Sequence, residues 1–339
     1  MKLSELDYDL PPELIAQQPL ERRDEARMEV LDRARGTIEH SRFYKLGRYL
    51  RAGDVLVLND TRVFPARVIA HKESGAKVEL LFVAPSDNPP GAWIAMIRAH
   101  RQCAPGARLL LDGAPALRVV GYQRPGRVIV VPEGAQPVIK TLWKAGLLAL
   151  PHYIKRAVTA ADAENYQTVY AAHTGAIAAP TAGLHFTPQL LRQLEEQGVR
   201  TVYVTLHIGP GTFAPVRSHE VEAHTMEGEW YTMAPAVAET IAHARRIGAR
   251  VVAVGTSSVR ALESYAVTGD LEGLTGLFIY PGFRFKLVEG MITNFHMPRT
   301  TVLAMVMAFA GRELTLAAYR DAIRHRYRFL SYGDAMLIL

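Results

Sequence analysis

The sequence predicts an α/β main domain, built on a mixed or largely parallel sheet with helices, that carries an inserted all-β barrel-like small domain. Three observations predict it. Short apolar runs separated by turn residues fill the region from about 63 to 131, whereas helix-like and strand-like segments alternate after residue 187. A strand-like run at 54–58 precedes the first region, so the main domain also includes the N-terminal segment. With 339 residues, the chain is long enough for two domains.

Six apolar runs in the middle of the chain predict the strands of the inserted domain. These runs are residues 63–70, 77–83, 93–98, 108–111, 116–122 and 127–131. Turn signals such as Pro105-Gly106 and Asp112-Gly113 separate them. Six strands at this spacing are typical of a small barrel or sandwich.

The rest of the chain follows a longer period. Thr187 is a suitable N-cap, Pro188 suits the first helical position, and Gly198 ends that helix. Further expected helices cover 235–247, the segment after Gly255, 300–309 and 315–326, and further expected strands cover 201–207, 250–254, 277–280 and 285–288. We therefore assign residues 1–62 together with 151–339 to the α/β domain, and residues 63–150 to the insertion.

Composition excludes several classes of protein. Hydrophobic residues make up 49% of the chain and charged residues 21%, as in ordinary globular proteins. The longest apolar run, 302–310, is shorter than the roughly 20 residues of a membrane-spanning helix. The N-terminus has no apolar signal segment, and the single cysteine, Cys103, can form no internal disulfide. We expect a cytoplasmic protein without a membrane partner.

Positive charge is concentrated in the predicted insertion. The net charge of the chain is +6, and the stretch from 98 to 127 carries six arginines against Asp112. Those candidate RNA-binding residues are Arg98, Arg101, Arg108, Arg118, Arg124 and Arg127. Solvated arginines on a strand face explain the same pattern.

Five polar loops follow predicted strands or lead into helices, where open α/β sheets place their ligand crevices. Their candidate residues are Asn59 and Arg62; Thr181, Gly183 and His185; His207, Gly209, Gly211 and Thr212; Gly255, Thr256, Ser258 and Arg260; and Asn294 and His296. Plain turns, helix caps and buried histidines explain such loops as well.

Motifs of several enzyme classes are missing. The twelve histidines form no HExxH motif and no close pairing with a carboxylate, so we expect no metal. The sequence contains neither the G-x-S-x-G elbow of hydrolases nor the glycine-lysine loop of a triphosphate site. The residues alone thus indicate an α/β enzyme with converging loops and a basic β insertion.

Over nearly its full length the chain resembles the S-adenosylmethionine:tRNA ribosyltransferase-isomerases of queuosine synthesis. The segments that carry the resemblance are 14–17, 56–63, 166–170, 179–187, 207–213, 255–264, 293–296 and 331–336. The sequence departs from the family at Glu227, where a second histidine is usual after His224-Thr225-Met226. That substitution puts a role for this position in doubt.

The resemblance implies transfer and isomerisation of the ribosyl part of S-adenosylmethionine onto 7-aminomethyl-7-deazaguanine at the tRNA wobble position. Epoxyqueuosine-tRNA, adenine and methionine are the implied products, and S-adenosylmethionine is consumed as a substrate, so no cofactor is expected. We expect His185 or His207 to act as the base, Arg260 or Arg62 to hold the methionine carboxylate, and Asn294 and Asp334 to orient polar edges. A monomer is favoured.

Two other classes of function stay open. A methyltransferase would use the same co-substrate but would carry a glycine-rich loop after its first strand, which is missing here. A non-catalytic RNA-binding or scaffold protein would keep the basic barrel without needing five polar loops.

Overall fold

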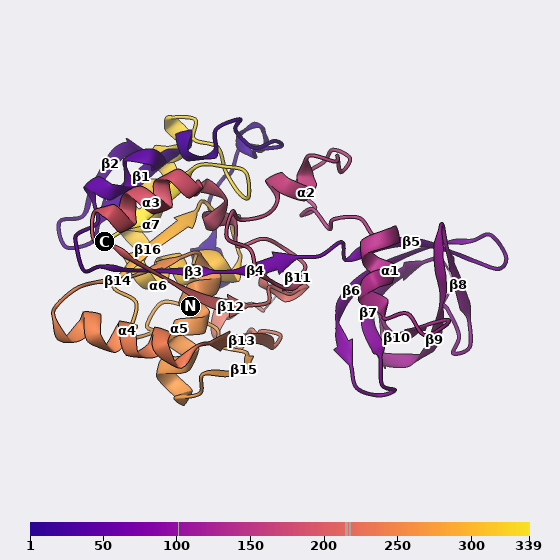
Figure 1. The fold of residues 1–339 in the computed structure, drawn as a ribbon. Coiled ribbons are helices and arrows are strands. Elements are labelled where there is room, and N and C mark those ends of the chain that lie inside the picture. Colours follow the sequence, from indigo (N-terminus) through magenta and orange to yellow (C-terminus); the bar gives the residue numbers. More distant parts are fainter. Residues whose placement is uncertain (101, 214–215, 217) are drawn as a thin grey trace.

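A computed structural model describes residues 1–100, 102–213, 216 and 218–339. A nine-stranded mixed sheet forms the larger part of the molecule (Figure 1). In spatial order its strands are β15 (Glu272–Thr275), β13 (Glu229–Met233), β12 (Arg200–Leu206), β3 (Val55–Asn59), β14 (Val251–Val254), β16 (Gly290–Asn294), β17 (Ala335–Ile338), β1 (Arg27–Asp32) and β2 (Thr37–Arg42). β12, β3, β14 and β16 run parallel to one another, and β17 is antiparallel to β16 but parallel to β1.

The central strand β3 shows why this sheet is covered on both faces. All five of its residues are buried, as expected for a strand inside a parallel sheet. Val55 and Val57 face the core beneath α4 (Pro235–Arg246), α5 (Thr256–Thr268), α6 (Thr301–Ala310) and α7 (Arg312–Arg324). Leu56 and Leu58 face the opposite core, which α3 (Pro188–Glu196) covers. The alternation of side chains along the strand thus produces a three-layer domain.

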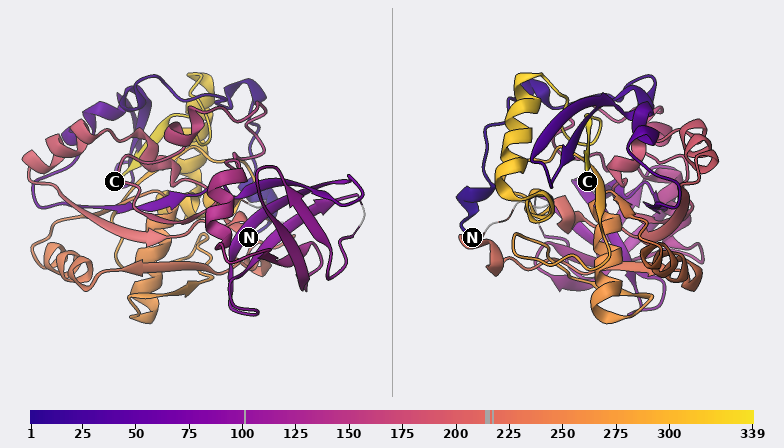
Figure 2. Two further views of the ribbon diagram at one scale, coloured as in Figure 1. Left: turned by 45° about the vertical axis from the view of Figure 1, so that its right-hand side comes forward. Right: turned by 90° about the vertical axis from the view of Figure 1, so that its left-hand side faces the viewer.

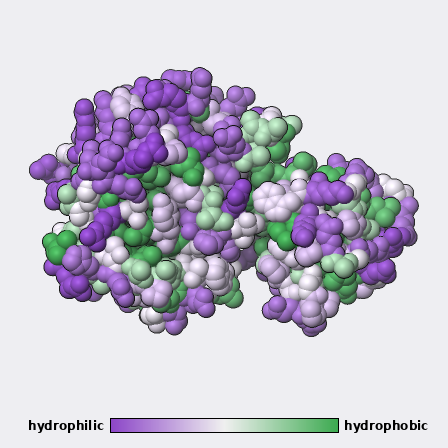
Figure 3. Space-filling model, in the orientation of Figure 1, coloured by the Kyte–Doolittle hydropathy of each residue, from purple (hydrophilic) through white to green (hydrophobic). Residues whose placement is uncertain are grey.

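A separate closed barrel follows β3 in the chain. Its strands, in order around the barrel, are β10 (Arg127–Pro132), β7 (Ala92–Ala99), β6 (Lys77–Ser86), β5 (Arg67–Lys72), β8 (Arg108–Leu111) and β9 (Ala114–Arg124). Helix α1 (Val138–Ala145) packs Val138 and Leu142 against the barrel core. The predicted six-stranded antiparallel insertion is therefore confirmed as a barrel. Figures 2 and 3 show it as a smaller lobe beside the main one.

Short elements connect the two lobes. β4 (Thr61–Val63) pairs in parallel with β11 (His173–Ala176), and α2 (Asp162–Asn165) lies on the returning chain. Two 3-10 turns, η5 (Thr181–His185) and η6 (Pro210–Phe213), carry predicted site residues.

Some expected elements differ in the structure. The predicted helices after Gly255 and at 235–247, 300–309 and 315–326 correspond to α5, α4, α6 and α7. The expected strands at 277–280 and 285–288 are loop. In the second segment, the Phe285 ring packs on Phe309 of α6, with ring centroids 4.9 Å apart, and does not belong to a paired strand.

No single helix in the described ranges is long and apolar enough to cross a membrane; α6 and α7 satisfy that test only as a pair bent by 114°, by length and composition alone.

Candidate active site

Four parallel strands bring the predicted loops to one edge of the large sheet. β12, β3, β14 and β16 are adjacent and share one direction, so their carboxyl ends meet at the same edge. At about 4.8 Å per strand, β12 and β16 are separated by about 14 Å. The barrel lies beyond this edge, in the direction in which β3 and β4 point (Figure 1). Both features agree with the predicted convergence of the loops.

His185 and Asn294 form the core of one group at this edge. The Asn294 side-chain amide lies 3.3 Å from Nε2 of His185 and donates to the Leu330 carbonyl at 3.0 Å. Burial lowers the pKa of His185 to about 4, so its imidazole is neutral at physiological pH. The Asn294 Oδ1 atom is buried and has no hydrogen-bond partner among the described residues. It is therefore an acceptor available to a bound molecule.

Two cavities adjoin this group and share Ser331. A cavity of about 240 Å³ is lined by His185, Arg23, Glu164 and Tyr332 among others. A smaller one, about 20 Å³, is lined by Thr181, Asn294 and His296. The Ser331 hydroxyl lies 2.7 Å from the Tyr153 hydroxyl. The structure thus places Thr181, His185, Asn294 and His296 around one serine, although His296 itself contacts Thr293 at 2.8 Å and has its pKa lowered to about 3 by burial.

His207 forms the second group. Its Nδ1 lies 2.8 Å from the Thr61 hydroxyl, and its ring stacks on Trp230 at 5.3 Å. Burial is the main cause that lowers the pKa of His207 to about 4. A Cβ atom at Gly175 would lie 2.5 Å from this ring, so glycine is required there for close packing. His207 remains half-buried, whereas His185 is buried.

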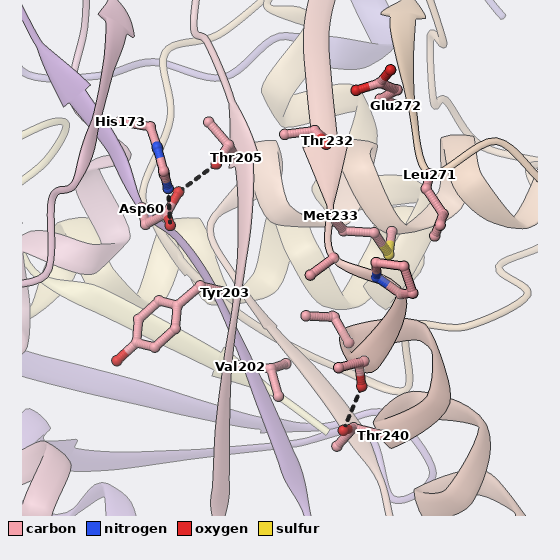
Figure 4. A pocket seen from close by; sticks show the side chains of 14 residues that line it. Asp60, His173, Val202, Tyr203, Thr205, Thr232, Met233, Thr240, Leu271 and Glu272 are labelled. Carbon is pink, nitrogen blue, oxygen red and sulfur yellow. Dashed lines mark hydrogen bonds and ion pairs between the residues drawn. The ribbon is translucent and has the colours of Figure 1, made fainter.

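A pocket of about 870 Å³ lies beside the His207 group, between β12, β13 and α4. Figure 4 shows Asp60 at one end of it, between His173 and Thr205. The Thr205 hydroxyl donates to Asp60 at 2.6 Å, and His173 lies 3.6 Å from the same carboxylate. Burial raises the pKa of Asp60 above its usual value. The pocket therefore has acidic side chains, Asp60 and Glu272, on two sides of a lining that also contains apolar residues such as Val202, Met233 and Leu271.

Arg260 has a structural position that argues against its predicted role. Its guanidinium forms a buried ion pair with Glu229 and donates to the Thr275 carbonyl at 2.9 Å. Glu229 in turn accepts a hydrogen bond from the Gly209 backbone at 2.7 Å. A guanidinium held in this way positions the Gly209 loop and is not presented to a substrate carboxylate. Arg62, the other candidate, is exposed on β4.

Asn59, Ser258 and Asp334 also have partners within the protein. Asn59 donates to the Leu206 carbonyl and to Ser257, and accepts from two backbone N–H groups. The Ser258 hydroxyl donates to the carbonyl four residues before it. Asp334 accepts from backbone N–H groups of Arg27 and Arg328 and pairs with the Arg27 guanidinium at 2.9 Å. These three predicted site residues thus fix the loops in place.

The remaining predicted binding residues are mostly backbone positions. Gly255 has φ +84° and precedes α5, whose first residue is Thr256. A Cβ at Gly183 would meet the Tyr170 hydroxyl at 2.1 Å, and one at Gly211 would meet Glu227 at 3.2 Å. The side chain of Thr212 lies outside the described part of the structure.

The barrel arginines are less free than their number suggested. Arg108 pairs with Glu73 and Glu133, and Arg118 pairs with Glu133. Arg124 and Arg127 both pair with Glu227 of the main domain. Arg98 is exposed, and Arg101 lies outside the described residues. Glu73, Glu133 and Glu227 lie outside the 98–127 stretch, so a count of charges within that stretch does not include them. The tertiary structure brings their carboxylates next to the arginines.

Known proteins resemble the chain over its whole length. The model of the family described as "Queuosine biosynthesis protein" matches residues 3–338. The chain belongs to this family. It is 48% identical to the S-adenosylmethionine:tRNA ribosyltransferase-isomerase of Moorella thermoacetica and 49% identical to that of Rubrobacter xylanophilus, with 100% of this chain covered in both cases and 100% and 98% of the relatives. A crystal structure of the S-adenosylmethionine tRNA ribosyltransferase of Thermotoga maritima aligns with a TM-score of 0.57 and 36% identity, covering 99% of this chain and 100% of the other.

Reasoning from the sequence missed several residues around these groups in this member of the queuosine biosynthesis family. Tyr153 and Arg23 lie far from the predicted loops in the sequence, and Thr61, Trp230 and Glu229 have no motif of their own. Ser331 falls in the 331–336 segment, which was used for the resemblance without a role being assigned. The sequence signal for Ser331 is the polar run at 331–334, which directly precedes the strand β17.

Proposed function

We propose that this chain transfers and isomerises the ribosyl moiety of S-adenosylmethionine onto 7-aminomethyl-7-deazaguanine at the wobble position of tRNA, releasing adenine and methionine. Membership of the queuosine biosynthesis family over residues 3–338 is the observation that supports it. S-adenosylmethionine is consumed as a substrate, and we propose no resident cofactor. We propose that the protein acts on its tRNA substrate in the cytoplasm, as a monomer.

The proposed reaction requires few functional groups from the protein. The sulfonium acidifies the neighbouring C5′ proton, and a base that removes it leaves an ylide-like carbanion that opens the ribose with loss of adenine. The substrate amine then attacks, and an alkoxide displaces methionine to close the epoxide. Positioning of the two substrates supplies much of the remaining acceleration, of order 7 to 11 kcal/mol.

We assign the base to His207 and a positioning role to His185. The Thr61 hydroxyl donates toward the His173 carbonyl at 3.4 Å, so it accepts from Nδ1 of His207 and leaves Nε2 of that ring unprotonated. His207 is also half-buried and reachable. In contrast, Nε2 of His185 already faces the Asn294 amide in the interior.

The position of the barrel supports the tRNA part of the proposal. A polyanionic anticodon arm lying on the barrel would reach the sheet edge that holds both histidines. Arg98 and Arg62 are exposed, while Arg124 and Arg127 share one carboxylate and keep part of their positive charge. Arg108 and Arg118 are the weaker candidates because Glu133 and Glu73 neutralise them.

The test compares histidine variants by mass spectrometry of tRNA after incubation with S-adenosylmethionine. His207→Ala should lower turnover by about 10²- to 10⁴-fold, the usual contribution of a general base, while S-adenosylmethionine affinity changes little. His243→Ala, an exposed histidine on α4, is the matched control. Turnover of His207→Ala within a few-fold of the unmodified chain would remove His207 as the base. Absence of adenine and epoxyqueuosine with the unmodified chain would remove the proposed function itself.

A further inference from the structure

Three side chains of the kind that bind metals lie near the edge of the sheet formed by β1 and β2, on the other side of β3 from β12 and the His207 group. Helix α7 packs over these edge strands. His40 of β2, Asp321 of α7 and His325 just after α7 place their ligand atoms within 4.8 Å of one another. Nε2 of His40 and Nδ1 of His325 each lie 3.1 Å from the same oxygen, Oδ2 of Asp321. The proposed chemistry uses none of these groups.

The spacing of these atoms fits a small divalent ion. Two ligands bound tetrahedrally at about 2.0 to 2.1 Å from zinc are separated by about 3.3 to 3.4 Å. The two separations of 3.1 Å are close to that value, so a slight widening would admit the ion. Two imidazoles with a carboxylate form a donor set preferred by zinc and related transition ions over magnesium or calcium.

The two oxygens of the Asp321 carboxylate face different partners. Its Oδ1 accepts from the Arg324 guanidinium, whereas Oδ2 faces the two imidazole nitrogens at 3.1 Å each. The charge of Arg324 therefore lies on the opposite oxygen from the two imidazoles. A cation bound between the imidazoles and Oδ2 would replace these two contacts with bonds from all three atoms to the ion.

A buried carboxyl group without a partner, that of Glu29, lies close to these three residues. Glu29 is fully buried, and neither of its side-chain oxygens has a hydrogen-bond partner in the described part of the chain. It pairs with His40 across β1 and β2, so the two side chains share one face of the sheet. Buried polar groups without partners are costly, and a bound ion with its water would supply a partner on this face of the sheet.

The surroundings of the histidines suit ligation. The Tyr327 hydroxyl lies 2.8 Å from Nδ1 of His40, which fixes that ring with Nε2 directed to Asp321. Nδ1 of His325 lies 3.0 Å from the Asp321 carbonyl and 3.1 Å from Oδ2 of the same residue. Both imidazoles are 43–49% exposed, which gives an ion direct access from solvent.

We propose that His40, Asp321 and His325 form a divalent transition-metal site that takes Zn²⁺ and joins the β1–β2 hairpin to α7. Water completes the coordination, with the buried Glu29 side chain behind it. The sequence predicted no metal because it contains no HExxH motif and no close pairing of histidine with a carboxylate was recognised, and His40 is far from α7 in the chain. The Asp-x-x-x-His spacing of Asp321 and His325, one helical turn apart, was the only local signal.

The test measures zinc binding by the full chain after removal of metals with EDTA and dialysis. Isothermal titration with ZnCl2 should show one saturable site in the unmodified chain, with the site lost in His40→Ala, His325→Ala and Asp321→Asn. His243→Ala, an exposed histidine on α4, should bind as the unmodified chain does. Tyr327→Phe keeps all three ligands but removes the hydrogen bond to His40, and should weaken zinc binding by about 10- to 100-fold.

A spectroscopic measurement separates a built site from surface binding. Co²⁺ in place of Zn²⁺ should give visible absorption bands with the unmodified chain and with His243→Ala, but not with His325→Ala. Circular dichroism of the EDTA-treated variants checks that they are folded. No saturable zinc binding, or equal binding by His325→Ala and His243→Ala, would overturn the proposal and leave the three residues as an ion-paired cluster.

Discussion

Glu29 allows the cost of a buried carboxylate to be measured. Its side chain is fully buried, and its pKa is raised to about 9 by burial, with Asp321 and Asp334 adding to the effect. In the unfolded chain the same group titrates near its ordinary value, about 4.3 to 4.5. Between these values the folded protein holds a proton that the unfolded chain has lost, so the free energy of unfolding falls as the pH rises.

The magnitude follows from the two pKa values. Each pH unit in this window costs about 1.4 kcal/mol, and allowing for partial titration near the lower limit, the loss between pH 5 and pH 7 is about 2 to 3 kcal/mol. Glu29→Gln has nearly the same shape and no titration, so this contribution to the slope disappears. The variant should therefore gain about 2 to 3 kcal/mol relative to the unmodified chain over the same pH interval.

Urea denaturation of both proteins at pH 5, 6 and 7, with EDTA present, measures this difference. Glu239→Gln, at an exposed position on α4, serves as the matched control and should follow the unmodified chain. If the curves of Glu29→Gln and the unmodified chain stay parallel from pH 5 to 7, Glu29 is ionised in the folded protein and the reasoning from its burial is refuted.

Three further predictions concern other contacts. Glu227→Ala should free Arg124 and Arg127 from their ion pairs and steepen the salt dependence of tRNA binding by up to about 0.7 to 0.9 log units per additional phosphate contact. Filter binding at several salt concentrations measures this slope, and an unchanged slope would contradict a role for both arginines. Asp162→Asn should destabilise the fold by about 2 to 4 kcal/mol at neutral pH, because the Arg156 ion pair and other hydrogen bonds hold the pKa of Asp162 well below its usual value. In urea titrations this loss of stability should shrink as the pH falls below about 4, where the unmodified chain loses the same interaction. A loss that does not depend on pH would contradict the prediction. Thr187→Ala should cost about 1 kcal/mol of stability by thermal unfolding, since the Thr187 hydroxyl accepts from the Leu190 backbone at 3.1 Å at the start of α3, and an unchanged Tm would show that this cap contributes nothing.

Local patterns determined the architecture and the family of this protein. Alternating apolar runs with turn residues specify the barrel strands, and caps such as Thr187-Pro188 specify where helices start, because these signals act over a few residues. The loops after β3, β12 and β14 were predictable for the same reason, since polar residues follow apolar strands directly, whereas β16 itself was not predicted. Strings in those loops carried the resemblance that the family comparison confirms.

Tertiary structure alone decided what the individual side chains do. Arg260 was expected to meet a substrate, but Glu229, on a strand that was not predicted, holds it in the interior. The barrel arginines met Glu73, Glu133 and Glu227 only through strand pairing and the approach of the two lobes. Likewise, His40 reaches Asp321 because β2 lies at the edge of the sheet that α7 covers. Pairing between residues distant in the chain depends on how strands and helices pack, so a local sequence pattern does not predict it.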